Sequence, residues 1–178
     1  QKYLPGNPRV VSLYVLSAGG VRAANMLTGT IKNDGFTIAN IGTTIFVRAV
    51  SKDPIVQYRL SDFVYLGAPS AGGPYGLLVR PLGLDTLGKL RAYAKLRLAE
   101  RSVGHTMYTV GRIIAFVLEL KDAQWVVGYE SPEVDIAVQR AEADARTEVI
   151  YDLVKNRPEW RQQGFTVPVV LKNIKGRG

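Results

Sequence analysis

The chain has 178 residues, of which 47% are hydrophobic and 21% are charged, so it can bury a core without disulfides or a metal. It contains no cysteine, which excludes disulfides, thiolate nucleophiles and cysteine-based metal clusters. The net charge is +8, and the longest apolar run is far shorter than the ~20 residues that span a bilayer. We therefore expect a single domain over residues 1–178 with no membrane span.

The first 80 residues are rich in valine, isoleucine, threonine and aromatic residues, which favours strands. The clearest hairpin pattern is TGTIKNDGFTIAN, in which Lys32–Gly35 separate two Thr/Ile runs and include residues that tolerate a positive φ. The expected strands cover 10–16, 26–31, 36–41, 43–50, 55–66 and 77–80. An antiparallel meander is the simplest arrangement of these segments.

The glycine pair Gly19-Gly20 follows the first apolar run and raises the question of a phosphate-binding loop. Neither the G-x-x-x-x-G-K-[ST] nor the G-x-G-x-x-G spacing is present. Because the next residues fit a hairpin better than a helix, we expect a simple turn here and no cofactor site.

Residues 67–83 contain five glycines and three prolines with Arg80 as the only charge, which predicts a loop or arm. A helix is then expected over about 85–101, because leucines recur at helical spacing. Two apolar runs, 107–120 and 125–129, are interpreted as a second hairpin. A final strand follows Phe165, with Pro168 marking an edge position.

The strongest helix pattern covers about 132–156, with Ser131 as N-cap, Pro132 at the first helical position and Pro158 beyond the end. This segment is apolar on two sides, which is typical of a helix buried between two bodies. We expect the second apolar set to form an oligomer interface, made of Ile136, Ala143, Ile150 and Val154.

Five cations fall within the expected helix at 85–101: Lys89, Arg91, Lys95, Arg97 and Arg101. Together with Tyr93, they resemble a surface that contacts phosphates and stacks bases. One alternative is a solvated helix face whose arginines extend beside the leucine stripe. Another is a contact with the acidic helix of a neighbouring copy through Glu142, Asp144 and Glu148.

Catalytic patterns are weak. Ser70 lacks the first glycine of a G-x-S-x-G nucleophile elbow, and the one histidine, His105, is the only candidate base. The acids are spread singly, so no metal ligands or paired catalytic carboxylates stand out.

The sequence thus predicts an α+β fold with a mostly antiparallel sheet or sandwich and two main helices. The expected function is a non-enzymatic structural subunit that assembles with copies of itself, as in a virion capsid, tail or sheath. The alternatives are a nucleic-acid-binding or packaging protein and, more weakly, a serine hydrolase around Ser70 and His105. We infer no small-molecule substrate, and a virion or cytoplasmic location.

Overall fold

The computed structural model describes residues 5–15, 18–68 and 73–172. It divides into two compact units, Gln1–Phe63 and Val64–Gly178. The single domain expected from the sequence therefore stays a prediction.

Helices rather than strands organise the first unit. The 3-10 helix η1 (Ala18–Gly20) leads into α1 (Val21–Gly29), and α2 (Thr44–Val50) and the 3-10 helix η2 (Leu60–Asp62) follow. Val21 and Ala24 of α1 pack with Ile45 of α2 and with Tyr58, whose hydroxyl donates to the Ile45 carbonyl at 2.7 Å. Packing of this small apolar cluster outweighs the local β-propensity, so the strands expected at 26–31 and 43–50 are wrong. Among the described residues no strand forms at 10–15, 36–41 or 55–66 either, so the expected hairpin and antiparallel meander are also wrong.

The glycine pair before α1 lets the backbone pass close to neighbouring side chains. Gly19 and Gly20 have φ angles of 64° and 93°, in the left-handed region that favours glycine. A Cβ at Gly19 would lie 2.7 Å from the Thr44 side chain, and one at Gly20 would lie 2.7 Å from Ile41. The turn expected here is present, but it opens a helix instead of a hairpin.

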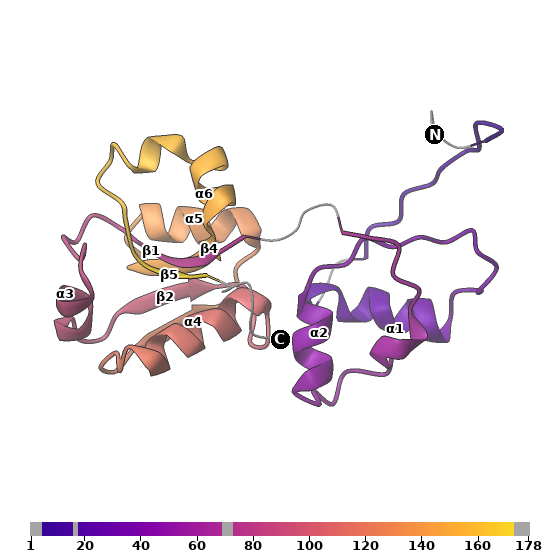
Figure 1. The fold of residues 1–178 in the computed structure, drawn as a ribbon, viewed down its shortest axis with the longest axis horizontal. Coiled ribbons are helices and arrows are strands. Elements are labelled where there is room, and N and C mark those ends of the chain that lie inside the picture. Colours follow the sequence, from indigo (N-terminus) through magenta and orange to yellow (C-terminus); the bar gives the residue numbers. More distant parts are fainter. Residues whose placement is uncertain (1–4, 16–17, 69–72, 173–178) are drawn as a thin grey trace. The chain divides into compact units, whose positions relative to one another are not determined.

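The second unit is built on a five-stranded sheet with the order β3-β2-β4-β1-β5 (Figure 1). Its elements are β1 (Tyr75–Val79), α3 (Leu87–Ala92), β2 (Arg97–Glu100), α4 (Thr106–Val117), β3 (Gln124–Val127), α5 (Ser131–Gln139), β4 (Ala145–Val149), α6 (Ile150–Asn156), the 3-10 helix η3 (Pro158–Trp160) and β5 (Thr166–Leu171). β1 is antiparallel to β4 and β5, whereas β2 is parallel to β3 and β4. The α+β class is confirmed, but the sheet is mixed rather than mostly antiparallel.

Helix α4 covers one face of this sheet, and α5 and α6 cover the other (Figure 1). Successive side chains of β2 point to opposite faces of the sheet and so enter two different cores. Leu98 packs with Ile114 of α4, and Ala99 packs with Val134 of α5. Because helices cover both faces of the sheet, side chains on either face of a strand pack against a helix.

Two elements expected between residues 67 and 101 differ in the structure. The segment expected as an arm at 67–83 contains β1, where Leu77 and Val79 are fully buried in the α4-side core. The helix expected at 85–101 ends with α3, and β2 begins at Arg97 after Lys95 takes a φ of 59°. Leu90 and Leu98 pack in one core from a short helix and a strand, whereas Leu87 is exposed, so the helical spacing of these leucines is coincidental.

The long helix expected at 132–156 is α5, a turn, β4 and α6. Ala141 has a φ of 60° just after α5, and Glu142 donates its backbone amide to the Ala137 carbonyl at 2.9 Å. This left-handed turn ends the helix without glycine. The run at 107–120, expected to be a strand, is mostly α4, whereas the strand expectations at 125–129 and after Phe165 are confirmed by β3 and by edge strand β5.

Candidate functional site

The carboxyl ends of three parallel strands meet at one edge of the sheet in the second unit. The chain leaves β2 through α4 to reach β3 on one side, and then passes through α5 to β4 on the other side of β2. In open sheets of this kind, the crevice at such a reversal of strand order is the usual ligand-binding position. We refer to this end of β2 and β4 as the carboxyl edge.

The loop between β2 and α4 lines the carboxyl edge. Gly104 has a φ of 79°, and the His105 ring then accepts the Met107 amide at 3.2 Å, which caps α4. The Arg101 guanidinium lies 3.3 Å from the other ring nitrogen of His105 and 3.3 Å from a Glu130 carboxylate oxygen. A 12-residue helix therefore presents its amino end, with an adjacent arginine, at this edge.

Glu100, the last residue of β2, is an acid enclosed in the protein. Only 1% of it is exposed, and its Oε1 accepts the Thr147 amide of neighbouring β4 at 3.1 Å. Gly111 of α4 covers it, since a Cβ there would lie 2.9 Å from the Thr147 hydroxyl and 3.3 Å from Glu100 Oε1. Burial raises the pKa of the Glu100 carboxyl to about 7, although hydrogen bonding from Thr147 and the charge of Arg146 oppose that rise.

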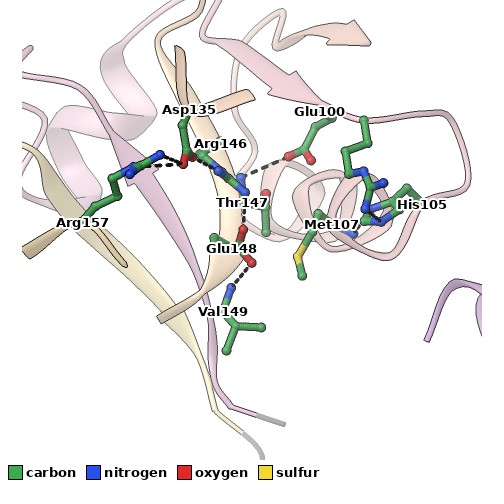
Figure 2. A network of polar contacts seen from close by, with 10 residues as sticks. Glu100, His105, Met107, Asp135, Arg146, Thr147, Glu148, Val149 and Arg157 are labelled. Atoms are coloured by element: carbon green, nitrogen blue, oxygen red, sulfur yellow. Dashed lines mark hydrogen bonds and ion pairs between the residues drawn. The ribbon is translucent and has the colours of Figure 1, made fainter. Parts of the chain in front are cut away.

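A network of ion pairs lies on the opposite face of β4 (Figure 2). Arg146 is 5% exposed and contacts the carboxylates of Asp135 on α5 and Glu148 on its own strand. Asp135 also pairs with Arg157 at 3.1 Å, and Glu148 accepts the Val149 amide at 2.8 Å. The network thus ties β4 to α5 and to the end of α6.

The network surrounds a small polar pocket of about 40 Å³, lined by residues that include Asp152 and Asn156. Its charges are largely paired with one another. Within the described ranges, no group of acids or histidines has the arrangement needed to hold a metal ion.

A larger cavity of about 310 Å³ opens at the other end of the sheet, where α4 turns into β3. Its walls include Phe116, Leu120 and Trp125, and the Arg112 guanidinium lies 4.4 Å from the Trp125 ring centroid. The arginine already occupies a ring face, which leaves a stacked pair rather than an open aromatic platform.

The five predicted contact cations do not share one helix. Lys89 pairs with Asp85 at 2.7 Å, and Arg91 donates to the Leu118 carbonyl at 3.2 Å. Lys95 is exposed in a turn. Their proposed role in binding nucleic acid or a partner remains a prediction, but the common face on which it rested is absent.

Arg97 explains the apparent charge complementarity of the sequence. It donates twice to Asp144, at 2.8 and 2.9 Å, and once each to the Ala141 and Glu142 carbonyls. Burial acts to raise the pKa of Asp144, but hydrogen bonds from Arg97 and Arg80 outweigh it and hold that pKa below its usual value. Basic and acidic segments therefore meet within one chain, at the amino end of β2.

The predicted oligomer-interface residues are also separated. Ala143 is fully buried against α5, and Ile150 is half-buried. Ile136 and Val154 are 40% and 67% exposed, but they lie on α5 and α6, so the single apolar helix face is not formed.

Of the proposed serine–histidine pair, Ser70 lies outside the described residues, and His105 caps α4. Sequence reasoning does not single out Glu100 or Arg146, because the acids are spread singly along the chain. Two signals were present: a carboxylate closing an apolar strand, and Gly111 inside an apolar helix.

Comparison with known proteins identifies the fold. No protein-family model matches the chain, and no curated protein matches it significantly. MatC from Rhodopseudomonas palustris, solved with bound malate, aligns over 86% of this chain and 53% of its own length, at 22% identity and a TM-score of 0.66. BugD, described as a periplasmic binding protein, aligns over 86% and 52% of the two chains, at 14% identity and a TM-score of 0.58. The chain thus spans about half the length of these proteins.

These similarities contradict the expected function. The fold is shared with a protein that holds a small molecule and with a periplasmic binding protein, so the predictions of a self-assembling virion component, of copies of itself as partners and of no small-molecule substrate are wrong. The virion or cytoplasmic location is corrected with them. The expectation of a chain that is not an enzyme agrees with this fold. No helix among the described residues is long and apolar enough to cross a membrane.

Proposed function

We propose that the chain is part of a solute-binding protein and that the carboxyl edge of β2 and β4 contributes to its ligand surface. The observation that carries the proposal is the reversal of strand order at β2, in a fold that aligns over 86% of the chain with a protein holding malate. The role is to bind and carry a solute, with no chemical step.

The proposed ligand is a small organic anion with at least one carboxylate. The amino end of α4 presents the positive end of the helix dipole, and Arg101 adds a cation beside it. The net charge of +8 favours an anion over a cation at long range. By analogy with BugD, the proposed location is the periplasm.

Isothermal titration calorimetry on the full chain tests this function. Malate, other C4 dicarboxylates, acidic amino acids and neutral sugars form the panel, with tryptophan fluorescence during thermal unfolding as a second readout. Both tryptophans, Trp125 and Trp160, lie in the second unit, so the signal reports on that unit. A ligand present at 100 times its Kd is expected to stabilise the protein by about 2.7 kcal/mol. Absence of binding by every acid would overturn the proposal.

Gly104→Ala is expected to weaken ligand binding about tenfold. An alanine at a φ of 79° is strained by ~1–2 kcal/mol, and the loop before α4 would shift to relieve that strain. Gly83→Ala is the matched control, because Gly83 has a φ of 70° and follows β1 at the opposite end of the sheet. Both variants should lose similar stability, but only Gly104→Ala should change the Kd. Equal affinities of the two variants would exclude the loop from the ligand surface.

A further inference from the structure

We propose that Glu100 links anion binding at the carboxyl edge to the uptake of one proton. The inference rests on the proposed function, but it concerns a residue behind the ligand surface. Glu100 is enclosed between β2, β4 and α4, and its carboxylate meets the Thr147 amide and the close-packed Gly111. It is therefore a positioned titratable group, not a ligand contact.

The position of Gly111 brings the carboxyl within electrostatic range of a bound anion. Gly111 is five residues beyond the first residue of α4, which corresponds to about 8 Å along the helix axis. Two like charges at about 8 Å in a partly buried setting change a binding constant by roughly tenfold or more. An anion at the amino end of α4 therefore disfavours an ionised Glu100.

The neighbouring charges leave this acid without a direct cationic partner. The titratable side chains on the packed elements are Arg97 on β2, Arg101 and His105 after it, Tyr108 and Arg112 on α4, and Arg146 and Glu148 on β4. The guanidinium of Arg146 is held on the opposite face of β4 by Asp135 and Glu148. No salt bridge in the described part of the chain reaches Glu100, and its pKa of about 7 places both protonation states within the working range of pH.

The direction of the linkage follows. Below pH 6 the carboxyl is already neutral, so an anion binds without proton uptake. Above pH 8 it is ionised in the free protein and must take up a proton or repel the ligand. Affinity for an anion should thus fall by about tenfold between these limits.

Calorimetry with malate over pH 5.5–8.5 tests the linkage on the full chain. For wild type we expect the roughly tenfold loss of affinity and, near pH 7.5, proton uptake seen as a dependence of the heat on the ionisation enthalpy of the buffer. Glu100→Gln keeps the shape of the neutral acid and should bind tightly with a flatter profile. Glu119→Gln, which alters an exposed acid at the far end of α4, should behave as wild type.

The outcomes separate the linkage from the proposed function. Every other titratable group, His105 included, is present in both wild type and Glu100→Gln, so the difference between their profiles isolates Glu100. Superimposable profiles, or the absence of buffer-dependent heat in wild type, would overturn the linkage and leave the solute-binding function standing. If neither protein binds malate, the test is repeated with another anion that binds. Equal pH dependence of that binding in wild type and Glu100→Gln would also overturn the linkage. Failure of every anion would overturn both.

Discussion

Arg146→Ala is expected to lower the free energy of unfolding of the second unit by about 3–5 kcal/mol. The guanidinium is 5% exposed and lies between the carboxylates of Asp135 and Glu148. Its removal leaves the half-buried Glu148 carboxylate without its cation and removes the ion pair that joins β4 to Asp135 of α5. Urea unfolding followed by tryptophan fluorescence measures the loss.

Lys89→Ala is the control for this prediction. Lys89 also forms an ion pair, with Asp85 at 2.7 Å, but more than half of each of these side chains is exposed. Solvent-exposed pairs contribute about 0–1 kcal/mol, so this variant should unfold close to wild type. Similar losses in Lys89→Ala and Arg146→Ala would show that burial of the network does not matter.

Glu100→Gln is expected to stabilise the second unit at alkaline pH by about 3 kcal/mol. The pKa of Glu100 rises from 4.5 to about 7 on folding because burial disfavours its charge. Below pH 4.5 the acid is neutral in both the folded and the unfolded state and has no effect. As the pH rises from 4.5 through 7, the unfolded chain releases the proton first, so the wild type loses stability, and above pH 7 the loss is constant.

Urea unfolding of wild type and Glu100→Gln at pH 4.5, 6 and 8 checks this result without any ligand. The difference between the two proteins should grow from near zero to its full value across that window. Glu119→Gln should show no such growth, because Glu119 is exposed. A constant difference across the three pH values would mean that Glu100 has the same pKa in the folded and the unfolded chain, so that burial does not raise it.

Several features of the second unit follow from local sequence. β3 and β5 are short runs of β-branched and aromatic residues, and Pro168 at an edge is compatible with a strand that lacks one ladder. The start of α5 is specified by Pro132 and by Glu133, whose side chain accepts the Glu130 amide at 2.7 Å. Each signal acts within a few residues, so sequence alone locates it to within one residue: the N-cap of α5 is Glu130 rather than the expected Ser131.

The longer elements could not be obtained in this way. Hydrophobic spacing near Leu90 and Leu98 fits a helix, but the two residues reach one core from α3 and β2. The α4 run contains Val110 and Ile114, which favour a strand locally, yet both pack at helical spacing against the α4-side core. Residues share a face about every 3.6 positions in a helix and every two positions in a strand. The hydrophobic spacing therefore identifies a buried face only after it is known whether the segment is a helix or a strand.

Composition and local patterns are enough to predict an α+β chain that can bury a core and has no cysteine chemistry. Proline, glycine and capping residues also mark the ends of some helices and strands. The tertiary structure decided where the charges go. Asp144 is 47 residues from Arg97, and Thr147 is 47 residues from Glu100, yet the first pair forms an ion pair and the second a hydrogen bond across neighbouring strands. Strand order sets these contacts, because β4 lies between β1 and β2 in the sheet. This order goes with the packing of α4 and α5 on opposite faces of the sheet.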